Sequence, residues 1–366
     1  MKIISVVGAR PNFMKVAPIY RAFRESKYAD VGLTHKICHT GQHYDENMSK
    51  VFFQDLALPT PDFYLGVGNG SHAVQTAKVM IEFEKVLLRE QPDLVLVVGD
   101  VNSTVACSLA AVKLGIGVAH VESGLRSFDR TMPEEINRIL TDAIAHYLFV
   151  TEHSGLHNLK REGIDDEKIF FTGNVMIDSL IFYLPRAAKS NIFCELNVNK
   201  AEYCLVTLHR PSNVDNQRRL AELLNFLNEL AKDKRVIFPV HPRTRNNIDL
   251  FKLHDKLDSD VLLIDPLGYI DFLALLEKAF LVITDSGGIQ EETTFLDVPC
   301  LTLRSSTERP VTVEMGTNYL VGEQINDAKK YFYQILHGET KQGQIPELWD
   351  GRTAERIAEI IAGNLL

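Results

Sequence analysis

A polar, glycine-rich turn at residues 285–288 separates an apolar run from a helix-forming segment. Such a junction aims unpaired backbone N–H groups and the positive end of a helix dipole at one point, which favours a phosphate. We expect Ser286 to cap the helix and to contact the same anion, while Gly287 and Gly288 let a ligand approach the backbone. Glu292, one turn later, is placed to accept hydrogen bonds from sugar hydroxyls. An ordinary capped helix is the alternative.

Two histidines each follow an apolar run in the second half of the chain. His209 is followed by Arg210, and Arg243 comes two residues after His241. A single histidine at such a position is more often structural, but two, each close to an arginine, favour anion binding. Arg309 is a further candidate cation. These residues predict a site for a phosphorylated ligand beside the glycine-rich turn.

Carboxylates collect in the first half of the chain. Asp100 and Glu122 each stand at the end of a predicted strand, and Glu134 opens a predicted helix four residues before Arg138. Each has an ordinary alternative, which for Asp100 is the N-cap of a helix over 103–114 and for Glu134 with Arg138 is a surface ion pair. Three carboxylate clusters in one region favour a catalytic site, because active sites gather titratable groups.

Further polar residues follow the first two predicted strands. Arg10 and Lys15 lie at the start of the first helix, where the alternatives are an anion-binding role and a solvated basic pair. Gln42 and His43 follow the second strand. Ligands of open parallel sheets bind at the carboxyl ends of the strands, so all four residues are candidates for the site.

The elements that must position these residues alternate between strand and helix. This alternation predicts an α/β protein with two doubly wound, parallel-sheet, Rossmann-like domains that face each other across a cleft. The predicted strands of the first series are 3–7, 34–39, 94–98, 116–121, 147–151 and 168–172, and those of the second are 203–208, 235–240, 261–264, 280–283, 299–303 and 318–321.

The polar run 189–200 suggests where the two domains meet. We expect an N-terminal domain over 1–173, a junction and hinge over 174–200, and a C-terminal domain over 201–350. The last segment, 351–366, has Ile357, Ile360 and Ile361 at helical spacing, so we expect a terminal helix that packs back on the first domain.

Composition excludes several classes of protein. A chain of 366 residues with 45% hydrophobic content can bury the cores of two domains. The formal net charge of −9 disfavours nucleic acid and anionic membrane as partners. The odd number of cysteines favours a reducing cytoplasm, and no apolar run approaches the roughly 20 residues of a membrane span. His35, Cys38 and His39 do not converge on an alternating strand, so we expect no metal site there.

The residues alone therefore suggest a nucleotide diphosphate in the second domain and carboxylates from the first domain around the group that it carries. A sugar is the natural candidate, because carboxylates stabilise oxocarbenium-like charge and move protons near it. Glycosyl transfer, hydrolysis and isomerisation all remain open at this point.

The ordered motifs resemble those of the non-hydrolysing UDP-N-acetylglucosamine 2-epimerases. The matching segments are Gly8-Ala9-Arg10-Pro11 with Lys15, Gly41-Gln42-His43, Gly99-Asp100, and residues 120–126, 133–138, 207–210, 284–292 and 307–310. The resemblance implies a two-domain fold of the GT-B type. It implies that UDP is bound by Arg10, Lys15, His209, Phe272, Ser286, Gly287, Gly288, Glu292 and Arg309. It also implies that the catalytic residues are Asp100, Glu122, Glu134, Arg138 and His209.

The implied reaction is reversible C2 epimerisation of a UDP-N-acetylglucosamine-type sugar, through elimination of UDP to a 2-acetamidoglucal and its re-addition. The family uses no metal or nicotinamide cofactor and is commonly dimeric. Possible contacts to the sugar or to a second ligand are Gln42, His43, Arg210, His241 and Arg243. One departure is that residues 66–74 lack the arginine with which many bacterial members bind a second, activating substrate molecule.

Several alternatives remain at this stage. A UDP-sugar glycosyltransferase, a hydrolysing 2-epimerase of the same fold and a non-enzymatic nucleotide-sugar sensor are the rivals. The sugar also stays open between plain N-acetylglucosamine, a 2,3-diacetamido uronic acid and a 6-deoxy sugar.

Overall fold

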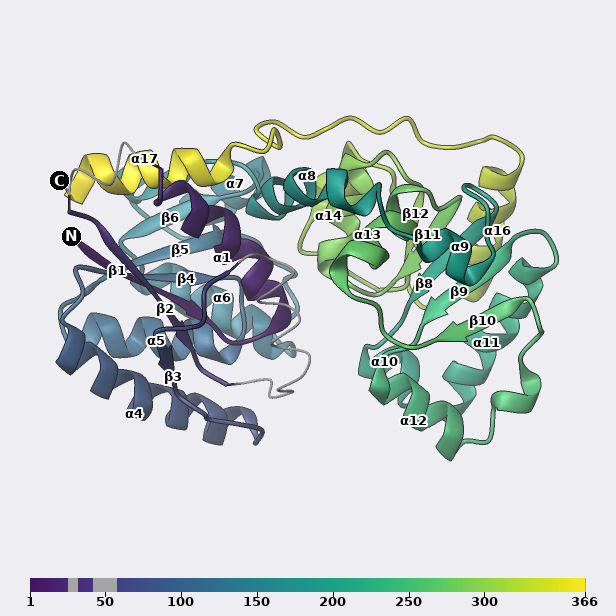
Figure 1. The fold of residues 1–366 in the computed structure, drawn as a ribbon, viewed down its shortest axis with the longest axis horizontal. Coiled ribbons are helices and arrows are strands. Elements are labelled where there is room, and N and C mark those ends of the chain that lie inside the picture. The colour runs from purple at the N-terminus through teal and green to yellow at the C-terminus, as the bar shows by residue number, and fades with distance from the viewer. Residues whose placement is uncertain (26–31, 42–57, 366) are drawn as a thin grey trace. The chain divides into compact units, whose positions relative to one another are not determined.

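The computed structural model describes residues 1–25, 32–41 and 58–365. It divides into two compact units, one made of residues 1–182 with 347–366 and the other of residues 183–346. Figure 1 labels the elements of both units. The predicted contacts Gln42 and His43 lie outside the described residues.

The first unit is built on a seven-stranded parallel sheet in the order β3-β2-β1-β4-β5-β6-β7. All five residues of β4 are buried, as expected for a strand covered by helices on both faces. The chain runs outward from β1 in one direction and continues from β4 in the other, so a topological switch point lies between β1 and β4. The strands are β1 (Lys2–Val7), β2 (Thr34–His39), β3 (Phe63–Tyr64), β4 (Leu94–Val98), β5 (Gly117–Ser123), β6 (Tyr147–Val150) and β7 (Ile169–Phe171).

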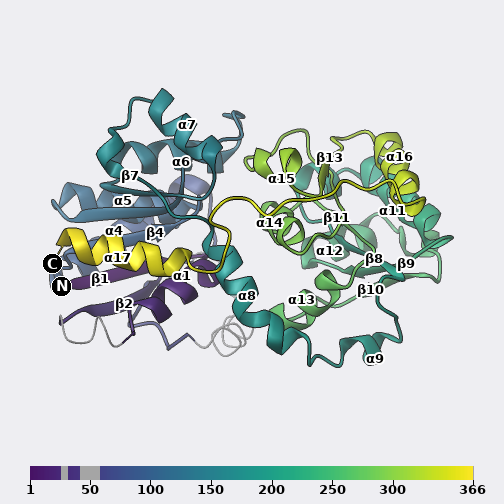
Figure 2. The same cartoon turned by 90° about the horizontal axis from the view of Figure 1, so that it is seen from above.

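Seven α-helices and one 3-10 helix of the described ranges belong wholly or partly to the first unit. α8 contains the division between the units, and α17 returns from the second unit to lie beside α1 (Figure 2). Asp178 of α8 fixes the start of α17, because its carboxylate accepts from the N–H groups of Thr353 at 3.2 Å and Ala354 at 2.7 Å. The helices are α1 (Arg10–Ala22), α4 (His72–Glu90), α5 (Asn102–Lys113), α6 (Pro133–Ile144), α7 (His153–Arg161), η1 (Asp166–Lys168), α8 (Val175–Ala187) and α17 (Thr353–Leu365).

The second unit repeats the arrangement with six parallel strands in the order β10-β9-β8-β11-β12-β13. Its switch point lies between β8 and β11. The strands are β8 (Tyr203–Thr207), β9 (Arg235–Pro239), β10 (Val261–Ile264), β11 (Leu281–Thr284), β12 (Cys300–Thr302) and β13 (Asn318–Leu320). The predicted doubly wound parallel fold is thus confirmed in both units.

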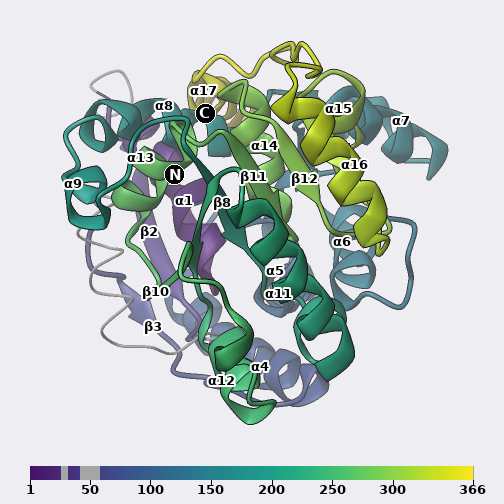
Figure 3. The ribbon, with the colours of Figure 1, turned by 90° about the vertical axis from the view of Figure 1, so that its right-hand side faces the viewer.

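Helices α11 and α16 lie side by side on one face of this sheet (Figure 3). Buried leucines of α11, among them Leu223 and Leu227, pack in one apolar cluster with Val236 and Phe238 of β9. The helices of the second unit are α9 (Ile192–Leu196), α10 (Pro211–Val214), α11 (Gln217–Ala231), α12 (Pro242–Leu250), η2 (His254–Lys256), α13 (Tyr269–Glu277), α14 (Gly287–Phe295), α15 (Pro310–Glu314) and α16 (Ile325–Leu336). No helix in the described ranges has both the length and the apolar character of a membrane span.

Candidate active site

Glu122, near the end of β5, forms a buried ion pair with Lys15 of α1. Both side chains are at least nine-tenths buried, and Glu122 adopts the left-handed backbone region with a φ of 71°. Gly99, with a φ of +66°, lies against this pair: a Cβ at residue 99 would stand 2.9 Å from Lys15 Nζ and 3.2 Å from Glu122 Oε2. A glycine is therefore needed for the turn after β4 to lie so close to the ion pair. A non-glycine residue with positive φ often marks a functional site.

Arg138 of α6 holds Asp100, which lies just after β4. Its Nε and Nη2 donate to Asp100 Oδ2 at 3.0 and 2.7 Å, and its Nη1 donates to Glu135 at 2.5 Å. Arg138 is only 3% exposed, so the alternative of a surface ion pair is wrong for this residue. Asp100 is not the N-cap of α5 either, because that position belongs to Val101. The arginine thus orients one carboxylate at the edge of the sheet.

Glu135 is a buried member of this site that the sequence analysis missed. It is 1% exposed, and it accepts hydrogen bonds from the backbone N–H groups of Ser127 and Phe128, both at 2.9 Å. Phe128 has a φ of 59°, so these bonds hold the loop after β5 in a strained conformation. Glu134, the residue that we had selected, is only partly buried. Glu135 therefore anchors both this loop and Arg138.

A fully buried histidine joins the two carboxylate-bearing turns. His120 Nε2 lies 2.8 Å from the carbonyl oxygen of Gly99, and its Nδ1 lies 2.6 Å from Asp142 Oδ1. Asp142 also accepts from the N–H of Gly124 at 3.0 Å and pairs with Arg126 at 2.7 Å. Burial opposes ionisation of Asp142, but His120 and Arg126 outweigh it and hold the pKa of this carboxyl below its usual value.

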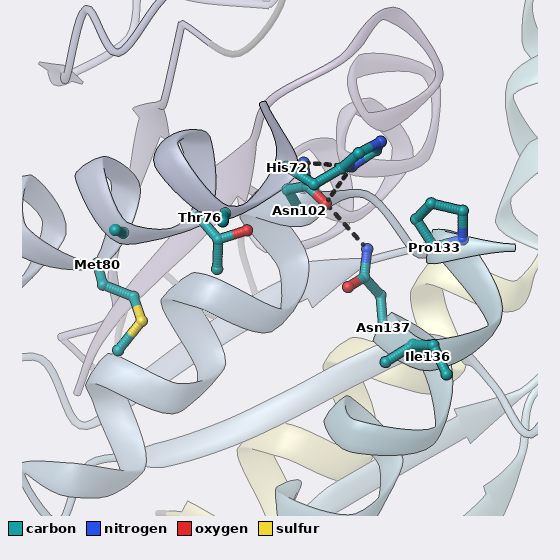
Figure 4. Close-up of a pocket in the computed structure, with 9 residues that line it drawn as sticks. His72, Thr76, Met80, Asn102, Pro133, Ile136 and Asn137 are labelled. Atoms are coloured by element: carbon teal, nitrogen blue, oxygen red, sulfur yellow. Dashed lines mark hydrogen bonds between the residues drawn. The ribbon is translucent and has the colours of Figure 1, made fainter. Parts of the chain in front are cut away.

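A pocket of about 420 Å³ is lined by residues of α4, α5 and α6 (Figure 4). Asn137 donates from Nδ2 to the carbonyl oxygen of Asp100 at 2.9 Å and to Asn102 Oδ1 at 3.3 Å, and Asn102 in turn contacts His72. The pocket thus has a polar end at the site and an apolar end along α4 and α6. Its lining residues are His72, Ala73, Thr76, Ala77, Met80, Asn102, Pro133, Ile136 and Asn137.

In the second unit, Asp285 ties the turn after β8 to the turn after β11. This buried carboxylate accepts from the N–H groups of His209 at 3.0 Å and Arg210 at 2.9 Å, and from Asn213 Nδ2 at 3.1 Å. The ring Nδ1 of His209 lies 2.9 Å from Asp285 Oδ1. The predicted histidine pair does come together, since the rings of His209 and His241 have centroids 5.6 Å apart. The carboxyl ends of the neighbouring strands β8 and β9 therefore carry two imidazoles that lie close together.

The glycine-rich turn begins α14 as predicted, with Ser286 at the N-cap position. The predicted capping by its side chain is wrong, because the Ser286 hydroxyl makes no capping hydrogen bond. A Cβ at Gly287 would stand 2.5 Å from Arg309 Nη1, so a larger residue there would have to displace the Arg309 side chain. Glu292 is 4% exposed and accepts from the Tyr269 hydroxyl at 2.9 Å. The turn at the N-terminus of α14 is thus packed tightly against an arginine.

Two of the predicted cations of this unit, Arg309 and Arg243, lie in ion pairs. Arg309 is 6% exposed and pairs with Glu291, at 2.7 Å, and with Glu308. Arg243 pairs with Asp215, its Nε at 2.7 Å from Oδ1. Both guanidinium groups are therefore held by carboxylates of the same unit.

The other candidates occupy defined positions. Arg210 donates from Nε to the carbonyl oxygen of Asp285 at 3.0 Å, and His241 caps α12 by accepting from the N–H of Arg243 at 3.2 Å. Phe272 lies in the first turns of α13 and is partly buried, and Arg10 is the first residue of α1. Within the described ranges, no group of three or more His, Cys, Asp or Glu side chains is arranged to hold a metal ion.

Comparison with known proteins identifies the family. Residues 26–362 match the family described as UDP-N-acetylglucosamine 2-epimerase. The chain belongs to the UDP-N-acetylglucosamine 2-epimerase family. A relative of that name from Methanocaldococcus jannaschii is 46% identical over 368 residues, which cover 99% of each chain. The UDP-2,3-diacetamido-2,3-dideoxy-D-glucuronate 2-epimerase of Pseudomonas aeruginosa is 41% identical over 365 residues, 99% of each chain.

Solved structures agree with this 2-epimerase assignment. A crystal structure of the M. jannaschii UDP-GlcNAc 2-epimerase in complex with UDP-GlcNAc and UDP superposes with a TM-score of 0.91 at 45% identity, covering 99% of this chain and 100% of that one. The two-domain α/β fold of the 2-epimerases is therefore the fold of this chain.

Proposed function

We propose that the protein catalyses the reversible C2 epimerisation of a UDP-N-acetylglucosamine-type sugar to the UDP-N-acetylmannosamine type. The observation that carries this proposal is the pair of oriented carboxylates in a member of the 2-epimerase family: Asp100 held by Arg138, and Glu122 held by Lys15. The two cationic side chains hold these carboxylates in place, and a carboxylate held beside the sugar can take up a proton.

The order of bond changes follows from the acidity of the sugar. The C2 proton has no adjacent carbonyl, so it becomes acidic only once the C1–O bond is largely broken. UDP therefore departs first with the bonding electron pair, and the N-terminus of α14 and His209 stabilise the diphosphate. A carboxylate then removes the C2 proton, which leaves a C1–C2 double bond in a 2-acetamidoglucal. Protonation on the other face of C2 and return of the UDP oxygen to C1 complete the reaction.

Asp100, Glu122 and Glu134 are the residues to which we assign the proton transfers, with Arg138 as the orienting cation. A C2 epimerisation needs a proton acceptor on one face and a proton donor on the other, so at least two of these carboxyl groups must act. We assign UDP binding to the remaining candidates of each unit, Arg10, Lys15, His209, Phe272, Ser286, Gly287, Gly288, Glu292 and Arg309.

Incubation with UDP-N-acetylglucosamine in heavy water, followed by NMR of the sugar, tests the proposal. We expect deuterium at C2 in both the recovered substrate and the product. Product without label at C2 would contradict the elimination route. Release of free UDP with a free sugar would instead indicate a hydrolysing epimerase, and turnover only with an added acceptor would indicate a glycosyltransferase.

A second sugar class has an observation in its favour, which is the 41% identical relative named for a 2,3-diacetamido uronic acid. The 46% identical relative favours plain N-acetylglucosamine. Comparison of kcat/KM for the two UDP-sugars decides between them. A preference of at least about tenfold, or about 1.4 kcal/mol, assigns the substrate.

We also propose a cytoplasmic homodimer whose N-terminal and C-terminal domains span 1–173 and 201–350, with a hinge in 174–200. The free cysteines support a reducing compartment. α4 supports self-association, because its exposed apolar residues Val74, Ile81 and Leu88 recur every seven residues along one stripe. Residues 174–200 include α8, which passes from one unit to the other.

A further inference from the structure

We propose that Asp285 is a positioning residue that fixes the tautomer of His209, so that His209 exchanges a proton through Nε2 alone. The inference rests on the proposed function of His209 beside the diphosphate. Asp285 is fully buried, whereas the side chain of His209 is 41% exposed. The carboxylate thus approaches the ring from the protein side, and the rest of the ring is accessible.

The two nitrogens of the ring have different environments. Nδ1 lies 2.9 Å from Asp285 Oδ1, whereas Nε2 makes no hydrogen bond to any residue in the described ranges. Burial opposes ionisation of Asp285, but its hydrogen bonds from His209, Arg210 and Asn213 outweigh it and hold the pKa of this carboxyl below its usual value. Asp285 is therefore an acceptor only, so Nδ1 must carry a proton in both the neutral and the cationic ring.

This arrangement matches the needs of a reversible elimination. When UDP departs, protonated Nε2 gives its proton to the departing diphosphate oxygen while the C1–O electron pair goes to the same oxygen. When UDP adds back, neutral Nε2 accepts that proton and the oxygen re-forms the bond to C1. Nδ1 keeps its proton throughout, and the adjacent carboxylate stabilises the cationic form of the ring. His241 and Arg210 are the other basic side chains near this ring.

The hydrogen bonds of Asp285 predict what an asparagine would do at this position. Oδ2 faces three donors, the N–H groups of His209 and Arg210 and the Asn213 amide, at 3.0, 2.9 and 3.1 Å. An asparagine at 285 will place its single amide oxygen there and its NH2 group toward the ring. That NH2 group can only donate to Nδ1, so Asp285→Asn should move the proton of the neutral ring to Nε2.

Two measurements test the proposal. In ¹⁵N-histidine-labelled protein, with the His209 signals assigned through His209→Gln, the neutral wild-type ring should show a protonated Nδ1 and the Asp285→Asn ring a protonated Nε2. In kinetics, Asp285→Asn should lower kcat by about 100-fold, the scale of acid–base catalysis, while Kd for UDP changes by less than about threefold. In the His209→Gln background, Asp285→Asn should not lower kcat further, because the aspartate acts through the His209 ring.

Asn213→Ser is the matched control. It removes one donor from Oδ2 but leaves the contact between Oδ1 and Nδ1, so it should keep the tautomer and keep kcat within about threefold of the wild type. A purely structural role for Asp285 predicts instead that its replacement lowers turnover equally in both backgrounds, and this result would overturn the proposal.

The outcomes distinguish a failure of the positioning role of Asp285 from a failure of the proposed epimerase function. If the wild type epimerises and Asp285→Asn is as active as the wild type, the positioning role is wrong and the proposed function stands. If the wild type shows no epimerisation, the proposed function fails, and the NMR spectrum still decides the tautomer. A neutral wild-type ring protonated at Nε2 would overturn the role of Asp285 in either case.

Discussion

Glu134 and Glu135 are adjacent glutamates that lie in different environments in the folded protein. Glu135 accepts from the backbone of Ser127 and Phe128 and from Arg138, whereas Glu134 is only partly buried. A buried carboxylate with so many donors has a structural role, because its loss leaves buried donors and a buried cation unpaired.

Glutamine substitutions should separate the two roles. Glu135→Gln should lower the free energy of unfolding by about 3 kcal/mol, because it breaks the buried pair with Arg138. Glu134→Gln should change that free energy by less than about 0.5 kcal/mol and lower kcat by about 100-fold. Urea unfolding and steady-state kinetics of both variants provide the check. Equal destabilisation by the two substitutions would contradict the division of roles.

At this scale, the sequence indicates the segment that carries the carboxylates beside Arg138 but not which of them is buried. Glu134 and Glu135 both lie within one turn of Arg138, so spacing cannot choose between them, and tertiary packing decides which one is buried. Asp285 was included only as part of a turn, because its partner His209 lies 76 residues away in the sequence. His209 and His241 could be predicted, because each follows a strand that ends at the same edge of the sheet.

At the scale of elements, β2 carries two histidines, His35 partly buried and His39 buried, that are neutral in the folded protein at neutral pH. His35 contacts the Ser5 hydroxyl at 2.7 Å, and His39 accepts from the N–H of Gly41 at 2.9 Å. Burial lowers the pKa of His35 to about 3 and that of His39 to about 4. Histidine in an unfolded chain has a pKa near 6.5. Below this pH, the unfolded state therefore binds two protons that the folded state does not bind.

The stability of the first unit should therefore fall as the pH falls. Above pH 6.5 both rings are neutral in the folded and the unfolded state, so they do not lower the free energy of unfolding. Below pH 6.5, protonation of the unfolded state lowers this free energy by about 1.4 kcal/mol per ring and per pH unit. The loss ends near pH 4 for His39 and near pH 3 for His35, where the folded state also becomes protonated. His35→Gln with His39→Asn should flatten the dependence of unfolding free energy on pH between 6 and 4. At pH 7.5 the rings are neutral in both states, so the difference in unfolding free energy between the variant and the wild type at this pH gives the effect of the substitutions on packing alone. An unchanged slope would contradict this account.

Most strands could be predicted because they are continuous apolar runs, and Leu94–Val98 matches its predicted bounds. β3 has two residues and α9 has five, which is too short for a period to be visible. α16 was missed although Ala328, Phe332 and Ile335 have helical spacing, so its signal was present in the sequence.

At the scale of the whole molecule, the proposed homodimer can be tested through α4. Val74, Ile81 and Leu88 are 47%, 56% and 60% exposed, and their spacing places them on one stripe suited to an identical helix. Ile81→Lys should convert the dimer to a monomer in multi-angle light scattering, because it places a charge in the centre of the apolar stripe. Glu84→Gln, an exposed position on the same helix, is the matched control. A dimer that survives Ile81→Lys would assign self-association to another surface.

The two-domain arrangement could be read from the double series of strands, but the path of the chain between the units could not. The division falls inside α8, a continuous helix, where the sequence shows no break in pattern. Only the tertiary contacts of each half of that helix reveal to which unit it belongs.

The return of α17 to the first unit has a consequence for biosynthesis. Ile357, Ala358 and Ile361 of this helix are fully buried, and α1 and Asp178 are among its partners. During translation, residues 183–346 emerge between the two segments that form the first unit. The second unit can therefore complete its core first, and the unit that carries Asp100 and Glu122 is completed only after the segment from 347 onward has left the ribosome. The unit to which we assign the proton transfers is thus completed last.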